Sequence, residues 1–581
     1  MSALPPVHLP PSRIDAGAFS PNFGSFIASL DAWMTRPRSI RAIVLTLSLY
    51  LLLAANWPLW LDLARIGRAP SVYLFSIVGM AWLLLAGTVA LLALTAWSRW
   101  MKPLWMLLVV VAALVQYYMF AYRMVMDPSM AANVMQTDPG EARDLLSLSM
   151  LGSVLLVSVP AVVWLWRVPV VAERWWSRLW RNAVLFLVAI AAVVAGGMAM
   201  SRTLAPLMRN EPHVRYMMNP LASVYSAGAA LARPMFQRSH KLVPITAGTA
   251  LGASYAGQAK PPMLVLVVGE TARADHFSLN GYARDTNPEL AARQVVSFAN
   301  VHSCGTNTLA SVPCMFSHLG KQGYESRKNE YENLLDVLQA AGLAVLWIDN
   351  QAGCKGVCVR VPNVQANDAK QQAAYPSLCS GDECLDEVML KGLDQRIAAL
   401  PPERTAKGVV VVMHQLGSHG PAYYKRSSEA LKRFQPECRT NTLSECSHAE
   451  LMNAFDNTIA YTDHFLAGTI DWLKSQSDRY QTGLVYMSDH GESLGEYGLY
   501  LHGMPYNLAP EVQKHVPFVA WLDGGLGRRE GITDACLRSG KDAELTHDNL
   551  YPTVLGLMDV KTPTYKPALD AFGRCRAAAA G

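Results

Sequence analysis

Two short motifs place acidic and histidine side chains directly after predicted strands. Glu270 follows the apolar run 263–268, and Asp489 and His490 follow the apolar run 484–487. In an open parallel sheet, ligands bind at the edge formed by the carboxyl ends of the strands. Carboxylates and an imidazole gathered at that edge could hold a zinc ion. Taken singly, Glu270 could equally cap the next helix, and Asp489-His490 could form a solvated turn.

A loop rich in hydroxyl groups supplies a candidate nucleophile. Residues 303–308 read Ser-Cys-Gly-Thr-Asn-Thr and lead into a predicted helix start. The free backbone N–H groups at such a helix end attract phosphate. The hydroxyl of Thr308 is a poor nucleophile at neutral pH, but a bound metal can lower its pKa, as metals do for water. Without a metal, Thr308 is more simply explained as a helix cap.

Two further histidines lie in His-Gly turns near the ends of predicted strands. His419 lies in Gly-Ser-His-Gly-Pro at 417–421, and His502 lies in Tyr-Leu-His-Gly-Met-Pro at 500–505. A single histidine is usually structural, but two similar turns favour a shared pocket. Together with the first two sets of residues, they indicate a metal-dependent phosphoryl-type transfer with a hydroxyl nucleophile.

The elements that must position these residues are short strands in the second half of the chain. From residue 262 onward, short apolar runs rich in β-branched residues alternate with helical stretches. This alternation predicts an α/β domain with a mostly parallel sheet covered on both faces. The runs that we expect to form its strands are 263–268, 343–348, 409–413 and 484–487.

The first half of the chain has a different composition. Of the 581 residues, 51% are hydrophobic and only 16% are charged, against roughly 25% charged in a typical soluble domain. Nearly all of the excess lies before residue 200, in five runs long enough to cross a bilayer, which needs about 20 apolar residues. These predicted transmembrane runs are 40–61, 71–97, 103–126, 147–166 and 182–200.

The charges between the runs predict the orientation of the chain. Arg36, Arg38 and Arg41 precede the first run, and the loops after the second and fourth runs are also basic. The loop after the third run carries four acidic residues against Arg143. By the positive-inside rule, the N-terminus is cytoplasmic and the chain emerges outside after the fifth run. The net charge of +5 is too small for this length to indicate a nucleic-acid partner.

All ten cysteines follow residue 300, in the half predicted to lie outside. An oxidising compartment there favours disulfides. The alternative is a structural zinc site built from four of them, Cys354, Cys358, Cys379 and Cys384. The pairs expected from the spacing are Cys304 with Cys314, Cys354 with Cys358, Cys379 with Cys384, Cys438 with Cys446, and Cys536 with Cys575.

The motifs resemble those of the lipid A phosphoethanolamine transferases, the colistin-resistance family of Gram-negative bacteria. The resemblance extends over about residues 40–560. It implies a membrane domain of five transmembrane helices, followed by a periplasmic α/β domain similar to alkaline phosphatases and sulfatases. The motifs that carry it are Gly-Glu-Thr-Ala-Arg-Ala-Asp-His-Phe at 269–277, Ser-Cys-Gly-Thr-Asn-Thr at 303–308, Cys-Lys-Gly-Val-Cys at 354–358, Gly-Ser-His-Gly-Pro-Ala-Tyr at 417–423 and Ser-Asp-His-Gly-Glu-Ser-Leu-Gly-Glu at 488–496.

The resemblance also implies a role for each matching residue. The positions that match the family's zinc ligands are Glu270, Thr308, Asp489 and His490, with Thr308 also the nucleophile. The positions that match residues holding the transferred group are His419, His502, Lys355 and Gln351, and the first two could instead hold a second zinc ion. The loop after the third run looks like the family's lipid-facing loop, with Asn133, Thr137 and Glu141 as candidate contacts. Their alternative is a capped helix lying on the membrane.

As an expectation, the resemblance gives a zinc-dependent transfer of phosphoethanolamine from phosphatidylethanolamine to a lipid A phosphate. The group would pass through a covalent intermediate on Thr308, and polymyxin resistance would follow. We expect a monomer in the Gram-negative inner membrane, in contact with membrane lipids. The expected divisions are a cytoplasmic extension (1–39), the membrane domain (40–200), a connector with interfacial helices (201–260), the periplasmic catalytic domain (261–575) and a disordered tail (576–581).

Several other readings stay open on the sequence alone. The acceptor could be the lipopolysaccharide core or another periplasmic glycan. A phosphoglycerol transferase of the lipoteichoic acid synthase type also has five runs and a metal-threonine domain, although the dense cysteine pairs argue against it. A phosphatase or sulfatase would not need five membrane runs. A transporter or receptor is disfavoured because ionisable residues are missing from the centres of the runs.

Overall fold

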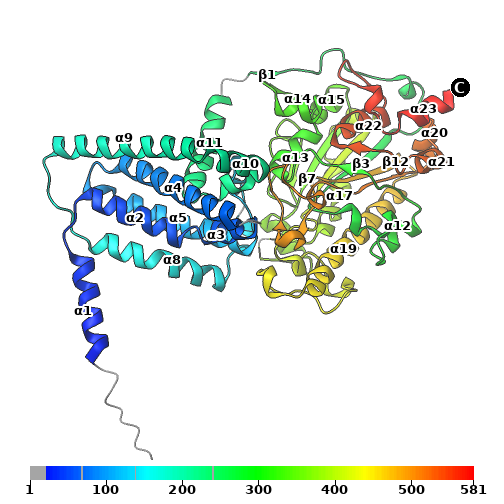
Figure 1. The fold of residues 1–581 in the computed structure, drawn as a ribbon. Helices are drawn as coiled ribbons and strands as arrows, with labels where there is room; N and C mark the ends of the chain where they lie inside the picture. Colours follow the sequence, from blue (N-terminus) through cyan, green and yellow to red (C-terminus); the bar gives the residue numbers. More distant parts are fainter. Residues whose placement is uncertain (1–20, 67–69, 138, 238–240, 382, 581) are drawn as a thin grey trace, which may run out of the picture. The chain divides into compact units, whose positions relative to one another are not determined.

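The computed structural model divides the chain into two compact units (Figure 1). It describes residues 21–66, 70–137, 139–237, 241–381 and 383–580. The first unit comprises Met1–Asn56, Leu63–Leu114 and Ser153–Pro206, and the second comprises Trp57–Asp62, Val115–Gly152 and Leu207–Gly581. The loop after the third run therefore belongs to the same unit as the α/β domain. Of the predicted extension 1–39, only the part from residue 21 is described, beginning with α1 (Pro21–Thr35).

Apolar helices dominate the first half of the chain. Among the described residues, four helices are long and apolar enough to cross a membrane, and a bent pair adds a fifth span if it is counted as one. The pair is α2 (Ile40–Ala54) and α3 (Trp57–Ile66), bent by 52°. The four are α4 (Pro70–Thr95), α5 (Lys102–Ala121), α8 (Leu148–Arg167) and α9 (Trp175–Ala199).

The first predicted span is thus two helices with a break, and the sequence explains it. Pro58 lacks an N–H, so it cannot donate to the carbonyl of Ala54, and the helical hydrogen bonds are interrupted between Ala54 and Trp57. At the break, the side-chain amide of Asn56 donates a hydrogen bond to the carbonyl of Leu51 at 2.8 Å, near the end of α2. The last span also differs from the prediction, since α9 begins at Trp175 rather than at residue 182.

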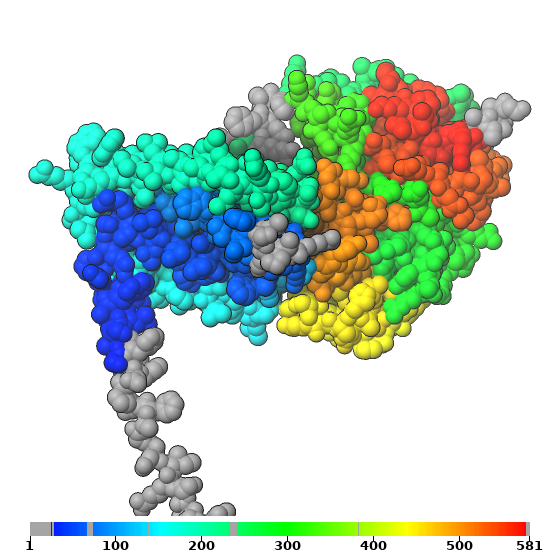
Figure 2. Space-filling view, viewed as in Figure 1, coloured from blue at the N-terminus to red at the C-terminus, as the bar shows by residue number. Residues whose placement is uncertain are grey.

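Within the first unit, α4 and α9 pack closely (Figure 2). Gly196 of α9 makes the approach possible, because a Cβ at this position would lie 2.3 Å from the Trp82 ring. The Trp82 indole donates to the carbonyl of Ala192 at 2.8 Å. Small residues at a helix contact are a common device for packing helices in membranes.

The second unit contains a seven-stranded sheet in the order β4-β15-β12-β3-β11-β7-β8. All neighbouring pairs are parallel except those of β15, which is antiparallel to β12 and β4. All four runs predicted as strands form strands of this sheet, so the expected mostly parallel sheet is confirmed. The strand bounds are β3 (Pro262–Gly269), β4 (Val296–Phe298), β7 (Ala344–Asp349), β8 (Asn363–Gln365), β11 (Val409–His414), β12 (Gln481–Ser488) and β15 (Phe518–Leu522).

Helices cover both faces of the sheet. Figure 1 shows α15 (Leu334–Ala340) and α22 (Leu550–Leu557) on one face, and α17 (Leu393–Ala398) and α19 (His448–Ser475) on the other. Leu264 and Leu266 of β3 join the apolar core under α15 and α22. Every residue of β3 is buried, as expected for a central strand with helices on both sides.

This core makes a first testable prediction. Leu266 is fully buried in the central strand, so Leu266→Ala removes apolar contacts and leaves a cavity. We expect the free energy of unfolding to fall by about 2–5 kcal/mol, seen as a lower midpoint of thermal unfolding for the detergent-solubilised chain. Leu242→Ala is the control, since Leu242 is 41% exposed. An equal shift in both variants would contradict the assignment of Leu266 to the core.

The segment between the third and fourth spans contains short helices. α6 (Pro128–Met135) begins at the N-cap Asp127, whose carboxylate accepts from the N–H of Met130 at 2.9 Å. α6 packs against α11 (Leu221–Gln237) and α13 (Thr308–Met315). α7 (Pro139–Asp144) follows it, and α10 (Ser201–Asn210) lies in the predicted connector.

The end of the chain also forms a helix. Where the sequence predicts a disordered tail from residue 576, the structure has α23 (Gly573–Ala580). The run of alanines before Gly581 accounts for it, because alanine has the highest helix propensity. Residue 581 lies outside the described residues.

Candidate active site

The candidate site lies at the carboxyl ends of four adjacent strands, β12, β3, β11 and β7. Ser488 of β12 pairs in register with Gly269 of β3. The next residues of the two strands, Asp489 and Glu270, are therefore neighbours, and the N–H of Asp489 donates to the carbonyl of Gly269 at 2.9 Å. Ligands bind at this edge in open α/β sheets, which is the placement that the sequence predicts.

Glu270, Asp489 and His490 form a compact group of possible metal ligands. One ligand atom from each lies within 4.8 Å of the others, and all three side chains are fully buried. His490 Nε2 lies 3.3 Å from Glu270 Oε1 and 3.4 Å from Asp489 Oδ2. Buried carboxylates this close together repel each other unless a cation lies between them.

Two observations fit these residues to a metal ion. Asp489 Oδ2 is buried and has no hydrogen-bond partner among the described residues, although buried polar atoms are normally paired. His490 Nδ1 lies 2.9 Å from the carbonyl of Gly491. That carbonyl only accepts, so Nδ1 carries the proton and the neutral ring leaves Nε2 free to bind a metal. Two carboxylates and one imidazole form a set of ligands that suits zinc.

The charges of the group are strongly coupled. Burial raises the pKa of Glu270, but the hydrogen bond and charge of His490 outweigh it and hold the pKa well below its usual range. Burial and the neighbouring Glu270 raise the pKa of Asp489 to about 7. Burial lowers the pKa of His490, but Asp489 and Glu270 together raise it to about 10. In the absence of a metal, a proton on His490 compensates for part of the negative charge.

Thr308 lies against this group. It is the first residue of α13, and the side chain of the N-cap Asn307 accepts from the N–H of Ala310 at 2.9 Å. Asn307 therefore caps the helix, which leaves the Thr308 hydroxyl available. Thr308 Oγ1 donates toward Glu270 Oε2 at 3.1 Å and lies 3.5 Å from His490 Nε2. The hydroxyl is thus placed where a metal held by Glu270 and His490 could activate it.

The structure also brings the two predicted histidines together. The rings of His419 and His502 are 5.3 Å apart, and His502 lies 4.4 Å from the ring of His490. His502 Nδ1 lies 3.2 Å from the carboxylate of Glu492, which is fully buried. A carboxylate in this position fixes the orientation of the imidazole.

Gln351 joins the group, but the described contacts of Lys355 lie within its own loop. The Gln351 amide donates to Glu270 Oε2 at 3.1 Å. The Lys355 ammonium donates to the carbonyl of Ala352 at 3.0 Å, and the residue has a left-handed backbone with φ of 49°. Gln351 therefore contacts a candidate metal ligand directly, whereas a phosphate contact for Lys355 stays a prediction.

The three candidate residues after the third span are less closely tied to the group. Asn133 lies in α6, and Thr137 Oγ1 donates to the Asn133 carbonyl at 3.1 Å, within the same segment. Glu141 belongs to α7, but its side chain lies outside the described residues. α6 itself is close to the site, since it packs against the helix of Thr308 and a Cβ on Gly503 would lie 2.3 Å from Met130 Cε.

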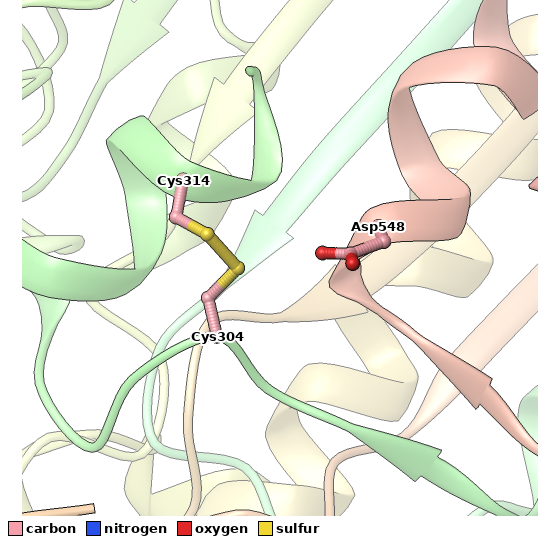
Figure 3. A group of neighbouring side chains, drawn as sticks. All are labelled: Cys304, Cys314 and Asp548. Carbon is pink, nitrogen blue, oxygen red and sulfur yellow. A yellow bond between two sulfur atoms is a disulfide. The ribbon is translucent and has the colours of Figure 1, made fainter. Parts of the chain in front are cut away.

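Disulfides pair all ten cysteines, as predicted. The pairs are Cys304–Cys314, Cys354–Cys358, Cys379–Cys384, Cys438–Cys446 and Cys536–Cys575. The four cysteines of the alternative zinc site are therefore used in two disulfides. A second group of possible ligands, Cys304, Cys314 and Asp548, is no metal site either, because the two sulfurs are bonded to each other (Figure 3). Asp548 instead accepts from the N–H of Lys321 at 2.8 Å.

Comparison with known proteins places this site in a family. Residues 262–560 match the sulfatase family, and residues 84–235 match the family described as phosphoethanolamine transferase EptA/EptB. The phosphoethanolamine transferase EptA of Salmonella typhimurium is 39% identical over 475 residues, which cover 81% of this chain and 84% of that protein. The chain belongs to the phosphoethanolamine transferase family.

Two further proteins extend the comparison of this transferase. The phosphatidylethanolamine transferase Mcr-1 of Escherichia coli is 39% identical over 480 residues, which cover 81% of this chain and 86% of that protein. The structure of the integral membrane lipooligosaccharide phosphoethanolamine transferase A of Neisseria meningitidis matches with a TM-score of 0.85 at 32% identity, covering 92% of this chain and 98% of that chain. The predicted fold, a helical membrane domain followed by a sulfatase-like α/β domain, is confirmed.

The sequence analysis missed residues that hold the transferase site in shape. Asp386 is buried, and its carboxylate accepts from the N–H groups of Leu416 and Gly417 at 2.8 and 3.1 Å, just before His419. Glu492 orients His502 as described above. Glu492 lies inside one of the sequence motifs, three residues after Asp489. This position could have identified it as a candidate site residue. Nothing in the local sequence marks Asp386, because its partners lie some thirty residues further along the chain.

Glu492 carries a second testable prediction. Glu492→Gln keeps the size of the side chain but removes the negative charge that lies 3.2 Å from His502 Nδ1. We expect the rate of phosphoethanolamine transfer to fall by about 10- to 100-fold, the range for a partner that orients a functional histidine. Transfer of a labelled headgroup measures it. Glu511→Gln is the control, because Glu511 pairs with the partly exposed His302 and its loss should leave the rate within about twofold. An unchanged rate in Glu492→Gln would contradict the orienting role.

Proposed function

We propose that this transferase moves phosphoethanolamine from phosphatidylethanolamine to a phosphate group of lipid A, through a covalent intermediate on Thr308. The observation that carries the proposal is the contact of Thr308 Oγ1 with Glu270 Oε2 at 3.1 Å and with His490 Nε2 at 3.5 Å. A buried hydroxyl beside groups that can hold a divalent ion is the arrangement of an activated nucleophile.

The proposed substrates follow from the relatives and the membrane helices. Mcr-1 is named for phosphatidylethanolamine, and the Neisseria protein is a lipooligosaccharide phosphoethanolamine transferase. Lipid A is the phosphate-bearing membrane anchor of such a glycolipid. Donor and acceptor are both amphiphiles, so a membrane-anchored enzyme meets them at a high effective concentration.

We assign the proposed zinc ion to Glu270, Asp489 and His490, with the Thr308 oxygen as a further ligand. When bound, zinc would stabilise negative charge on the attacking oxygen and on the transferred phosphoryl group. His419 and His502 then bind the headgroup phosphate, or hold a second zinc ion if two bind. Gln351 and Lys355 donate to oxygens of the same phosphate, and Asn133, Thr137 and Glu141 contact the lipid.

In the first step, Thr308 Oγ1 attacks the phosphorus of phosphatidylethanolamine. The bond between phosphorus and the glycerol oxygen breaks, and phosphoethanolamine is left as an ester of Thr308. The Thr308 proton passes to water, because the low pKa of Glu270 makes this carboxylate a poor base, while its hydrogen bond with Oγ1 orients the hydroxyl. His502, oriented by Glu492, donates a proton to the glycerol oxygen so that diacylglycerol leaves as an alcohol.

In the second step, an oxygen of the lipid A phosphate attacks the phosphorus held on Thr308. The bond from phosphorus to Oγ1 breaks, and Oγ1 takes up a proton from water. The proton of the attacking phosphate passes to His502, which restores the starting enzyme. Diacylglycerol leaves before the acceptor reacts, so the scheme predicts ping-pong kinetics.

The same proposal gives the location and the consequence of the reaction. The site lies in the periplasm, on a monomer in the Gram-negative inner membrane whose N-terminus is cytoplasmic. The disulfides agree with an oxidising compartment. Each added ethanolamine brings a positive ammonium group to a phosphate of lipid A. The surface becomes less negative, so cationic polymyxins bind it less well.

Mass spectrometry of lipid A tests the proposal. A Gram-negative host expresses either the full chain or Thr308→Ala, with protein amounts matched by immunoblot. We expect lipid A heavier by one phosphoethanolamine group only with the unaltered chain, together with a higher polymyxin tolerance. Unmodified lipid A in the presence of labelled core or glycan would overturn lipid A as the acceptor. If no labelled ethanolamine leaves the phospholipid, the transfer itself is refuted.

A further inference from the structure

Arg426 lies seven residues after His419 and connects three separate segments of the second unit. Its side chain is only 2% exposed, although arginine is rarely buried without partners. Each part of its guanidinium has an acceptor in a different segment. The segments are the His419 turn, the hairpin closed by Cys379 and Cys384, and helix α7 after the third span.

The contacts are short and involve all three nitrogens of the guanidinium. Nε donates to the carbonyl of His419 at 2.9 Å, Nη1 donates to Glu383 Oε2 at 2.6 Å, and Nη2 donates to Asp144 Oδ2 at 3.0 Å. The planar guanidinium fixes the directions of all three bonds at once. The position of the His419 backbone is therefore linked to the positions of Asp144 and Glu383.

Asp144 is the last residue of α7 and is itself held firmly. Its side chain is 6% exposed and also pairs with the Lys425 ammonium. Its backbone carbonyl accepts from the Asn441 amide at 2.6 Å. Charge-assisted hydrogen bonds of this kind are stronger than neutral ones. They join α7 to the loop that follows His419 at several points.

We propose that Arg426 is a positioning residue, which holds the His419 turn in its working place only while Asp144 and α7 are docked against it. The inference rests on the proposed function, since His419 is there assigned to the headgroup phosphate. The segment 128–144 carries the residues assigned to the lipid. Arg426 therefore couples the docking of segment 128–144 to the geometry of the headgroup site.

A purely structural role is the competing explanation, and the choice of variant separates the two. Replacing Arg426 itself would leave the carboxylates of Asp144 and Glu383 without their cation, which is expected to unfold the unit. Asp144→Ala leaves Arg426 paired with Glu383 and removes the carboxylate that connects α7 to Arg426 and Lys425. The backbone contact of residue 144 with Asn441 stays. Asp336→Ala is the control, because Asp336 is another buried carboxylate that accepts two charged hydrogen bonds, in its case both from Arg360. Asp336 also accepts from the N–H of Asn333 at the start of α15.

The test measures transfer of labelled phosphoethanolamine by the full chain in proteoliposomes that contain phosphatidylethanolamine and lipid A. We expect Asp144→Ala to lower kcat by about 10- to 100-fold, the effect of moving a functional group from its working geometry. KM for the donor should stay within twofold, and Asp336→Ala should keep the kcat of the unaltered chain. Midpoints of thermal unfolding should fall equally in the two variants.

The decisive measurement repeats Asp144→Ala in a His419→Asn background, with long incubations to follow the residual rate. If Asp144 acts through Arg426 on His419, the second substitution causes no further loss, because coupled residues are not additive. A further loss by the same factor would overturn the inference, as would an unchanged kcat in Asp144→Ala alone. An unaltered chain that transfers no label refutes the proposed function instead, so the two failures are distinguishable.

Discussion

Thr308→Ala is expected to lower the rate of phosphoethanolamine transfer on the order of 10⁴- to 10⁶-fold, the range seen when a nucleophile that acts within a catalytic group is removed. Thr308 Oγ1 lies 3.1 Å from Glu270 Oε2 and 3.5 Å from His490 Nε2. Alanine leaves the other three candidate metal ligands, Glu270, Asp489 and His490, unchanged. If activity is lost while the fold is unchanged, the cause is the missing Thr308 oxygen, which accepts the phosphoryl group in the proposed reaction.

Two variants make the Thr308 experiment specific. Thr308→Ser keeps a hydroxyl on the same carbon and should retain far more activity than alanine. Thr469→Ala removes an equally buried hydroxyl, which donates only to the carbonyl of Phe465 within α19, and should leave the rate within about twofold. In the unaltered chain supplied with donor alone, a peptide containing Thr308 should carry phosphoethanolamine by mass spectrometry. An active Thr308→Ala protein, or a label on another residue, would disprove the covalent role.

Asp489→Asn is expected to reduce both the bound zinc and the transfer rate, the latter by at least about 100-fold, which exceeds the usual effect of an outer-shell partner. Asp489 is fully buried, and its Oδ2 has no hydrogen-bond partner among the described residues. The amide keeps the volume of the side chain but removes the negative charge that a divalent ion requires. Zinc per protein is measured by elemental analysis after dialysis, and the rate by transfer of labelled headgroup.

The control for Asp489→Asn is Asp368→Asn. Asp368 is the N-cap of α16 (Ala369–Ala374), where one carboxylate oxygen accepts from two backbone N–H groups. Asparagine caps helices about as well as aspartate, so zinc and rate should match the unaltered chain. Addition of a chelator to the unaltered chain should reproduce the loss, and zinc should restore the rate. Full zinc and full activity in Asp489→Asn would remove Asp489 from the metal site.

The strands and the residues that follow them were predictable because the signal is local. β3, β7, β11 and β12 are short, continuous apolar runs, and Glu270 and Asp489 come directly after two of them. The edge rule for parallel sheets then brings these residues together without any knowledge of strand order. The hydroxyl-rich loop before a predicted helix start marked Thr308 as a candidate nucleophile, with helix capping as the alternative. The structure shows that Asn307 performs the capping.

The residues that position the site were beyond the sequence because their contacts join distant segments. Arg426 meets Asp144 across 282 residues of chain, and no periodicity or motif connects the two. The segment 115–152 is another example. It lies between predicted spans in the sequence, but it belongs to the same compact unit as the α/β domain. The bend before Trp57 could have been predicted from Pro58. A prediction from hydrophobicity alone misses it, because one proline hardly changes the hydrophobicity of the run.

The pairing of β3 with β12 has a consequence for the order of events during synthesis. The N–H of Thr271 and the carboxylate of Asp489 that it approaches are 218 residues apart in the chain, and contacts so distant are late to form. Glu270 alone is a single carboxylate and cannot retain a metal. A nascent or truncated chain that ends before β12 therefore lacks Asp489 and His490 and has no complete site for the proposed metal. For the proposed metal site, metal uptake would indicate that the sheet is complete and in the right register, because a shift of one residue would turn Asp489 to the opposite face.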